Sequence, residues 1–266
     1  MSVKPIKVRA LEYLASDNIC VPHAFTTRLG GVSTGALSSL NISFHRGDED
    51  ENVVENIRRL GEAVGFDPRK MVLSHQVHSD TIRAVTPEDC MGFDHHQYPQ
   101  CDALITNTPG LCLMVFTADC TPILLHDPVT GAVGAVHAGW RGTALDLAGK
   151  TARAMADAYG CKAENIRAAI GPNIGFCCFQ TDADVPRAIE KTYGSPAQSY
   201  IRSQGDKYYV NLKAINALSL ENAGVTKIEI SDACTVCEHD RFWSHRVTGG
   251  LRGSQGAVIL CKEGRP

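Results

Sequence analysis

The spacing of apolar and polar residues along the chain predicts a mixture of helices and short strands. A helix is expected over 48–65, because apolar side chains recur at helical spacing from Val53 to Val64 and Gly65 follows them. Further helices are expected over 143–159, 182–193 and 211–223. Strands are expected over 1–14 (an edge strand), 71–85, 104–106, 111–116, 123–126, 132–136, 166–170, 228–230 and 257–260. Residues 24–47 and 86–101 are expected to be loops, and the whole pattern favours one compact α/β (α+β) domain over residues 1–266.

Composition narrows the class of protein. Apolar residues make up 44% of the 266 residues and charged residues 21%, which is ordinary for a globular domain and excludes wholesale disorder. The net charge of −3 argues against nucleic-acid or membrane-surface binding, which calls for a basic excess. The N-terminus lacks the apolar run of about 7–15 residues typical of a secretory signal. The stretch Leu111–Phe116 is too short to span a bilayer. We therefore expect a cytoplasmic protein with free thiols.

The 11 cysteines and 10 histidines raise the question of metal binding. Burial as a small hydrophobe is the default expectation for each cysteine. One pair stands out, because a hairpin turning near Val129 would place Cys120 almost directly opposite His137. Opposed residues on one face of a hairpin have Cβ atoms roughly 4.5–5.5 Å apart. A thiol and an imidazole at that separation could form a nucleophilic pair or share a metal ion, whereas the structural alternative is ordinary core packing.

Two further features lie beside this pair. His75 and His78 have opposite strand parity, so at most one of them should face the same site. One cysteine and two histidines suit Zn²⁺ with an open fourth position, which activates bound water. Glycines follow His137 and lead into a predicted helix, where Arg141 could bind phosphate or carboxylate. An ordinary glycine-rich turn is the alternative.

Several segments carry a resemblance to a known family. They read HQVHSD (75–80), TADCTPI (117–123), VHAGWRG (136–142) and IGPNIGFCC (170–178), with FTTRLGGVS (25–33), SLNI (39–42) and FWSHR (242–246). These segments resemble, in the same order, a family of zinc-binding bacterial proteins long labelled multicopper polyphenol oxidase or laccase-like. That family is associated with purine nucleoside phosphorylase and adenosine deaminase activity and includes peptidoglycan editing factors.

The resemblance implies a ligand set and a fold. The family's zinc ligands fall on His78, Cys120 and His137, which we also expect to be catalytic. The choice of His78 over His75 rests on the resemblance alone. The implied fold is a single domain with mixed β-sheets flanked by helices, similar to that labelled a cysteine hydrolase. The chain departs from the family pattern at polar positions, with Ile57 followed by Arg58, Gln180, and Arg252-Gly-Ser. None of these departures touches the three ligands.

The expected function is zinc-dependent phosphorolysis of purine nucleosides together with adenosine deamination. Adenosine, inosine and methylthioadenosine are the candidate substrates, and phosphate is the partner. The candidate phosphate contacts are Arg141, Arg46, Arg58 and Arg246, with Arg28 as a further candidate. The H-x-E and P-C-x-x-C signature of the cytidine-type zinc deaminases is absent, and we interpret the lone C-x-x-C at 234–237 as structural.

Alternative functions remain open at this point. Copper-dependent polyphenol oxidation would need several coppers held by many histidines, but the chain has no His-x-His pair and His95-His96 lies in a polar loop. The three ligands could nevertheless bind one Cu²⁺. A hydrolase that edits peptidoglycan precursors would use Cys120 as its nucleophile. A non-enzymatic binding module is the simplest alternative. We expect no nucleic-acid or membrane partner and either a monomer or a homodimer.

Overall fold

Short strands and helices alternate along the chain in the computed structural model, which describes residues 3–90, 92, 93 and 99–262. The strands are β1 Lys4–Val8, β2 Leu11–Ala15, β3 His23–Thr26, β4 Met71–Val72, β5 Ile82–Ala84, β6 Ala103–Thr106, β7 Cys112–Thr117, β8 Thr121–His126, β9 Val133–Ala138, β10 Arg167–Ile170, β11 Gln180–Thr181, β12 Ile201–Gln204, β13 Lys207–Val210, β14 Lys227–Ile230 and β15 Gln255–Leu260. The helices are α1 Asp50–Val64, α2 Trp140–Ala144, α3 Leu147–Tyr159, α4 Asp184–Tyr193, α5 Leu212–Asn222 and α6 His245–Thr248, with 3₁₀ turns at Gly35–Leu37, Pro68–Lys70, Pro87–Asp89 and Ser195–Tyr200.

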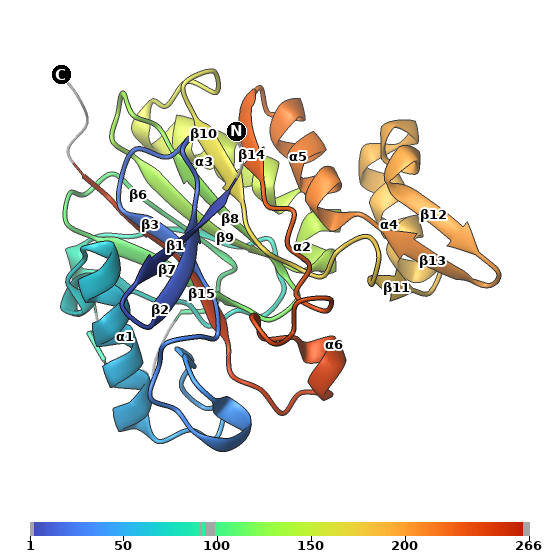
Figure 1. The fold of residues 1–266 in the computed structure, drawn as a ribbon. Coiled ribbons are helices and arrows are strands. Elements are labelled where there is room, and N and C mark those ends of the chain that lie inside the picture. Colours follow the sequence, from blue (N-terminus) through green and yellow to red (C-terminus); the bar gives the residue numbers. More distant parts are fainter. Residues whose placement is uncertain (1–2, 91, 94–98, 263–266) are drawn as a thin grey trace.

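The strands form two six-stranded sheets and one small sheet. The first sheet has the order β1-β2-β3-β15-β7-β4, and the second has the order β14-β10-β8-β9-β6-β5. Both are mixed, since β4 runs parallel to β7, β14 to β10 and β5 to β6, while the remaining pairs are antiparallel. The small sheet, β11-β13-β12, lies with α4 at the right-hand edge of Figure 1. The expected α+β class with mixed sheets is confirmed.

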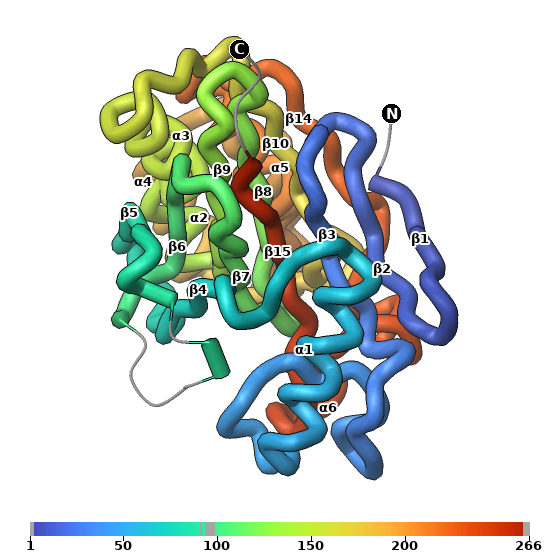
Figure 2. Tube along the Cα trace, turned by 90° about the vertical axis from the view of Figure 1, so that its left-hand side faces the viewer, coloured from blue at the N-terminus to red at the C-terminus, as the bar shows by residue number. Residues whose placement is uncertain are grey.

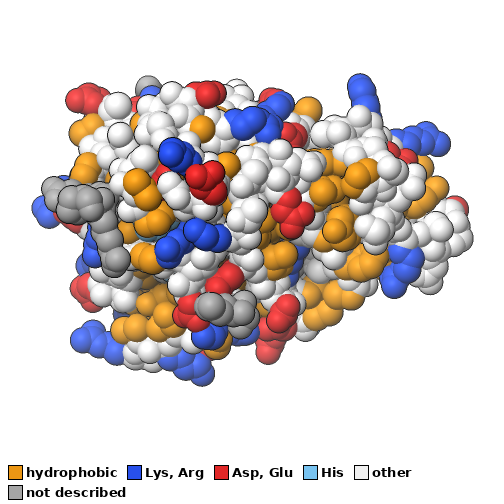
Figure 3. All heavy atoms as spheres, turned by 90° about the horizontal axis from the view of Figure 1, so that it is seen from above, with side chains coloured by type: hydrophobic (Ala, Val, Ile, Leu, Met, Phe, Trp, Pro, Cys, Tyr) orange, Lys and Arg blue, Asp and Glu red, His pale blue; other side chains and the backbone are white. Residues whose placement is uncertain are grey.

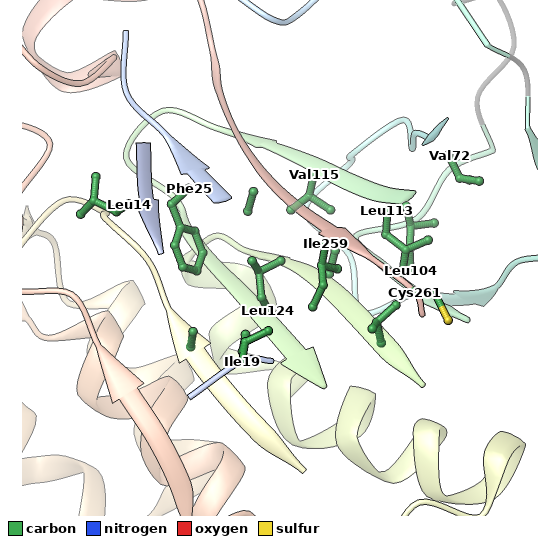
Figure 4. Close-up of a cluster of buried hydrophobic side chains, with 14 of the residues drawn as sticks. Leu14, Ile19, Phe25, Val72, Leu104, Leu113, Val115, Leu124, Ile259 and Cys261 are labelled. Atoms are coloured by element: carbon green, nitrogen blue, oxygen red, sulfur yellow. The ribbon is translucent and has the colours of Figure 1, made fainter. Parts of the chain in front are cut away.

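The two large sheets pack face to face around a shared apolar core (Figure 4). Leu113 and Val115 of β7 enter this core from one sheet, and Leu124 of β8 enters it from the other. The intervening side chains point the opposite way, because successive residues of a strand alternate between its two faces. Met114 thus packs toward α1, and Ile123 packs with residues of α3. Strands buried on both faces are apolar throughout, which is why these segments were recognisable in the sequence.

Helices cover the outer faces of both sheets. Helix α1 packs its apolar stripe of Val53, Ile57 and Leu60 on the first sheet, while α3 and α5 cover the second sheet. The result is four layers, helix–sheet–sheet–helix, as Figures 1 and 2 show from two directions. Among the described residues no helix combines the length and apolarity needed to cross a bilayer. On the face shown in Figure 3, acidic and basic side chains are interspersed and form no basic stripe.

The expected strand over 71–85 is wrong, because β4 ends at Val72 and β5 begins only at Ile82. Between β4 and β5 the chain leaves the sheet, because the side chain of Gln76 bonds to the backbone of β7. The Gln76 amide accepts from the backbone N–H of Phe116 at 2.7 Å and donates to that residue's carbonyl at 2.7 Å. The parity argument for His75 and His78 therefore does not apply, because these histidines lie in a loop.

The expected helix over 143–159 is divided in two. Asp146 adopts a left-handed backbone conformation, with φ of 62°, between α2 and α3. Its carboxylate is held by long-range contacts, because it accepts a hydrogen bond from the Ser219 hydroxyl of α5 at 2.6 Å and pairs with Arg153. A local apolar repeat cannot show such an interruption.

Two further expectations are partly corrected. The N-terminal segment forms two strands, and β1 is the edge strand. Residues 24–47 are not wholly a loop, because β3 occupies His23–Thr26. Within 86–101 the turn Pro87–Asp89 is short, and His95 and His96 lie outside the described residues.

Candidate metal centre

Three side chains distant in sequence meet at one end of the two sheets. His78 comes from the loop after β4, Cys120 directly precedes β8, and His137 lies in β9. The Cys120 Sγ lies 3.7 Å from His78 Nε2, and the two imidazole rings are nearly perpendicular, with centroids 4.9 Å apart. One ligand atom from each residue lies within 4.8 Å of the others. These three residues therefore form a candidate metal-binding group.

The hairpin brings Cys120 to His137 with a register different from the expected one. Pro122, not Cys120, pairs with His137, because the turn is centred between Val129 and Thr130 rather than at Val129. Cys120 lies one residue before β8 begins and approaches the imidazole from the preceding loop. There Asp119 adopts a left-handed conformation with φ of 83°, which redirects the chain just before the cysteine.

Asp102, which the sequence reasoning missed, holds two of the three ligands. Its fully buried carboxylate accepts a hydrogen bond from His137 Nδ1 at 2.8 Å, and this orients the other ring nitrogen toward Cys120. The same carboxylate accepts from the backbone N–H groups of His78 at 3.0 Å and Ser79 at 2.7 Å. The only local signal is a carboxylate directly before the buried strand β6.

The electrostatics of the group favour a thiolate. Burial raises the pKa of Cys120, but His137 and His78 outweigh this effect and lower it to about 6. Burial lowers the pKa of His137, yet Cys120 and Asp102 raise it to about 9. For Asp102, burial acts to raise the pKa of the carboxyl group, but the hydrogen bonds from His137 and Ser79 lower it to about 2. Thiolates are the form of cysteine that binds metals and attacks electrophiles.

Glycine is required where β9 meets α2. A Cβ on Gly139 would lie 2.8 Å from the Cδ2 atom of His78 and 3.1 Å from the Sγ atom of Cys120. The space beside the thiolate and imidazole is thus kept open by the absence of a side chain. Gly139 caps helix α2, which has only five residues, so the glycine-rich segment leads into a short helix before the longer α3.

The group lies in a cavity of about 500 Å³. Its walls come from residues 43–46, 74–76, 78, 116–118, 120 and 137, with Arg252 and Ser254 from the segment after α6. Figures 1 and 2 place the loop that contains residues 43–46 and helix α6 at the same end of the molecule. Arg46 and Arg252 both line the cavity. Burial and the nearby Arg46 charge lower the pKa of Arg252 to about 10.

Three buried polar atoms of residues that line this cavity have no hydrogen-bond partner among the described residues. They are the Oγ atom of Ser74, the Oγ1 atom of Thr117 and the Nε atom of Arg252. Arg252 does use its Nη1 atom, which donates to the Ser254 hydroxyl at 3.1 Å. Unpaired buried donors and acceptors are costly, so these atoms indicate a polar ligand in the cavity.

Of the four arginines that the sequence suggested, Arg46 alone lines this cavity. Arg58 pairs with Glu55 and Glu62 on the surface of α1 and lines a different cavity. Arg141 is exposed, with its guanidinium 4.2 Å from the centre of the Trp140 ring. Arg246 donates to the carbonyls of Cys178 and Gln180. The further candidate Arg28 stacks 4.0 Å from the ring of Trp243. The structure therefore gives no support to Arg58, Arg141, Arg246 or Arg28 as contacts at this cavity and adds Arg252, which the sequence reasoning noted only as a departure from the family pattern.

The expectation that the other ten cysteines are buried is wrong for half of them. Cys20, Cys177 and Cys237 are exposed, Cys90 and Cys178 are half-buried, and Cys101, Cys112, Cys161, Cys234 and Cys261 are buried. Four of the ten, Cys177, Cys178, Cys234 and Cys237, lie together, each sulfur within 4.8 Å of the others. The C-x-x-C at 234–237 is thus not a lone motif in three dimensions.

Comparison with known proteins identifies relatives of this chain and agrees with this fold. Residues 22–262 match the family model described as multi-copper polyphenol oxidoreductase laccase. The chain is 37% identical to a Deinococcus radiodurans protein named purine nucleoside phosphorylase, covering 94% of this chain and 92% of that protein. It is 38% identical to purine nucleoside phosphorylase YlmD of Geobacillus stearothermophilus, covering 90% and 89%.

Two solved structures have the same fold as this chain. The crystal structure of YlmD from Geobacillus stearothermophilus superposes with a TM-score of 0.92 at 34% identity, covering 99% of this chain and 100% of that one. The structure of the hypothetical protein YfiH from Bacillus licheniformis superposes with a TM-score of 0.89 at 32% identity, covering 96% and 98%. Fold, sequence and family model agree, and the chain belongs to the multi-copper polyphenol oxidoreductase laccase family.

Proposed function

We propose that this chain is a zinc-dependent purine nucleoside phosphorylase that also deaminates adenosine. One observation carries the proposal: two imidazoles and a thiolate converge in a cavity of about 500 Å³ that is also lined by two arginines. A cavity of this size is suited to a ligand as large as a nucleoside. The names of the relatives from Deinococcus and Geobacillus support purine nucleosides and phosphate as substrates.

The donor set fits zinc. His78, Cys120 and His137 supply two nitrogens and one sulfur, and three protein ligands leave a fourth tetrahedral position open. When bound, the ion would supply Lewis-acid polarisation at that position. A multi-copper centre would need more imidazoles, and the only other group of three or more close metal donors in the described part of the chain consists of cysteines. Copper-dependent phenol oxidation is therefore the weaker proposal.

Arg46 and Arg252 are the residues we assign to phosphate. Phosphorolysis breaks the bond between ribose C1′ and the purine nitrogen and forms a bond from C1′ to a phosphate oxygen. The products are the free purine and ribose 1-phosphate. A phosphate dianion between the two guanidinium groups would relieve their mutual repulsion and supply the acceptor that Arg252 Nε lacks. Deamination instead requires water at C6 of adenosine and releases ammonia.

A second function is favoured by one specific contact. Asp102, His137 and Cys120 form a chain of carboxylate, imidazole and thiolate, which is the arrangement that activates a cysteine nucleophile. In this alternative Cys120 attacks the substrate directly, and the substrate is a peptidoglycan precursor. The His78 imidazole close to the same sulfur favours the metal proposal, since a nucleophilic pair needs only one imidazole.

The test is an assay of the purified, zinc-loaded protein with adenosine, with and without phosphate. We expect phosphate-dependent release of adenine, with inosine as the product of deamination. Cys120→Ser should abolish both products, whereas the matched control Cys20→Ser, outside the cavity, should retain them. The absence of any purine turnover by zinc-loaded protein would refute the proposal.

Chelation separates the two functions. A metal enzyme should lose activity when zinc is removed and regain it when zinc is restored. A Cys120 nucleophile should be indifferent to chelator and inactivated by alkylation. Metal analysis of unsupplemented protein addresses the copper alternative, because one zinc at the His78 group without copper contradicts an oxidase.

A further inference from the structure

A second group of metal donors lies outside the cavity, where two parallel strands end. Strands β10 and β14 are parallel neighbours, with Ile170 paired to Ile230. The two segments that follow them stay adjacent, since Asn173 and Cys234 form an isolated parallel bridge. Cys177 and Cys178 occupy the turn after β10, and Cys234 and Cys237 occupy the turn after β14. Topology therefore brings together two pairs of cysteines, of which Cys177 and Cys237 are 60 residues apart in sequence.

The geometry of the four sulfurs fits a tetrahedral ion. The Sγ atoms of Cys177 and Cys237 are 3.6 Å apart, and those of Cys178 and Cys237 are 3.4 Å apart. All four sulfurs lie within 4.8 Å of one another. A zinc–sulfur bond of about 2.3 Å corresponds to an edge of about 3.8 Å in a regular tetrahedron. Disulfide bonding would instead require sulfurs about 2.05 Å apart.

The surroundings of Cys234 are those of a thiolate. The backbone N–H groups of Cys237, Gly175 and Val236 point at its sulfur. The N–H of Gly175 donates at 3.1 Å. A side chain on Gly175 would collide with this group, because its Cβ would lie 3.1 Å from the Sγ of Cys177 and 3.1 Å from that of Cys234. The backbone is thus arranged around sulfur atoms.

The other thiols need a cation to ionise together. Four thiolates this close repel one another strongly unless a positive ion lies between them. A partly compensating charge is close, since the buried Lys213 ammonium donates to the carbonyls of Ser231 and Ala233 beside the group.

We propose that Cys177, Cys178, Cys234 and Cys237 bind a structural zinc ion, separate from the candidate metal centre in the cavity. Four cysteine ligands close the coordination shell, so this zinc has no position for substrate. Its role is to join the turns after β10 and β14. The thiols lose their protons to solvent when the metal binds, and no oxidant or reductant is needed.

The joined turns hold the loop that carries Cys120. Thr235, between the cysteines of the C-x-x-C, donates its hydroxyl hydrogen to Asp119 at 2.6 Å. Arg246 donates its backbone N–H to the same carboxylate at 2.7 Å and its guanidinium N–H to the carbonyl of Cys178 at 3.2 Å. Asp119 is the residue next to Cys120. The proposed structural zinc therefore supports the position of a ligand of the other metal centre.

Metal stoichiometry tests the proposal on the full chain purified under reducing conditions. Native mass spectrometry and elemental analysis should find two zinc ions in the wild type and in the control Cys20→Ser. They should find one in Cys120→Ser and one in the double variant Cys177→Ser/Cys237→Ser. X-ray absorption of zinc in Cys120→Ser should show four sulfur ligands at about 2.3 Å.

The proposal is overturned if Cys120→Ser retains no zinc, or if its zinc has nitrogen and oxygen ligands. It is also overturned if the purified wild type holds a disulfide among the four cysteines, or if iodoacetamide alkylates them as fast as Cys20. These readouts do not require the double variant to fold. They are independent of adenosine turnover, so a failure of the proposed function would be seen separately.

Discussion

Asp102→Asn is the substitution that tests the candidate metal centre most directly. The side chain keeps its size but loses its charge and one acceptor. Five hydrogen-bond donors converge on the native carboxylate: those of His137 Nδ1, the backbone N–H groups of Val77, His78 and Ser79, and the Ser79 hydroxyl. An asparagine has one oxygen and an NH₂ group, so in either orientation at least two native donors face another donor.

The expected loss of stability in Asp102→Asn follows from these contacts. Hydrogen bonds to a buried charge contribute about 1.5–3 kcal/mol each, and a buried donor left without its acceptor costs about 1–3 kcal/mol. Because the contacts share one carboxylate and are not additive, we expect a loss of about 3–5 kcal/mol in the free energy of unfolding. Loss of the acceptor for His137 also frees its ring to rotate or change tautomer. We therefore expect zinc affinity to fall by about 10–100-fold.

Two measurements on each variant separate these effects. Urea unfolding of metal-free protein gives the stability, and competition with a chromophoric chelator gives the zinc affinity. Asp127→Asn is the matched control, because Asp127 is also fully buried and accepts from the backbone N–H groups of Val129 and Thr130, but in the turn between β8 and β9. It should keep its zinc affinity. If Asp102→Asn binds zinc within twofold of the wild type, Asp102 does not position the ligands.

Three further predictions address separate features. Gly139→Ala should lower zinc affinity about tenfold or more in the same competition assay, because the added carbon would lie 2.8 Å from an imidazole carbon. Gly142→Ala should not, because its new carbon would lie 3.2 Å from the flexible end of the Leu147 side chain and at ordinary contact distances of 3.5 and 3.6 Å from two carbonyl oxygens. Arg252→Gln should raise the KM for phosphate about tenfold with a smaller effect on kcat, and steady-state kinetics of Arg58→Gln should match the wild type. His126 is buried and its pKa is lowered to about 4, by burial first and then by the neighbouring arginine charge. Because the unfolded chain takes up this proton near pH 6.5, stability is lost as pH falls from 6.5 toward 4. Urea unfolding in chelator should show about 2 kcal/mol less loss between pH 7.5 and 5 for His126→Gln than for the wild type, and equal losses would contradict the assignment.

The parts of the fold that the sequence predicts are those set by local burial. Helix α1 was recognisable because one stripe faces a sheet and the rest faces solvent. Strands β7 and β8 were recognisable because both of their faces are buried, so their central positions, 112–116 and 123–125, are apolar. The family resemblance supplied the choice of His78, which no periodicity could make.

The errors share a physical cause, which is a polar contact made over a long sequence distance. Gln76 pins its loop to the backbone of Phe116, and this breaks a segment whose alternation suggested one strand. Asp146 bonds to α5 and interrupts a helix whose apolar repeat continues through it. Phe116 is 40 residues from Gln76, and Ser219 is 73 residues from Asp146. A periodicity argument compares residues only within about 11–18 positions, so it cannot detect either contact. Hydrogen bonds of this kind depend on the tertiary arrangement that they help to fix.

The residues of both candidate metal groups lie where the strands of the second sheet begin or end on one side, which is called its site edge below. The strand order explains this arrangement. Asp102 directly precedes β6, Cys120 directly precedes β8, and His137 lies near the end of β9. Since β9 is antiparallel to both β6 and β8, these three positions share the site edge. Strand β10 is antiparallel to β8 and parallel to β14, so Cys178 and Cys234, which follow β10 and β14, emerge at the site edge as well. The strand order β14-β10-β8-β9-β6 places these residues in two neighbouring groups, and sequence patterns do not reveal that order. The four-cysteine group after β10 and β14 therefore lies beside the loop that precedes β8. We expect a change in the cysteine group to shift the position of Cys120, because Thr235 and Arg246 both bond to Asp119.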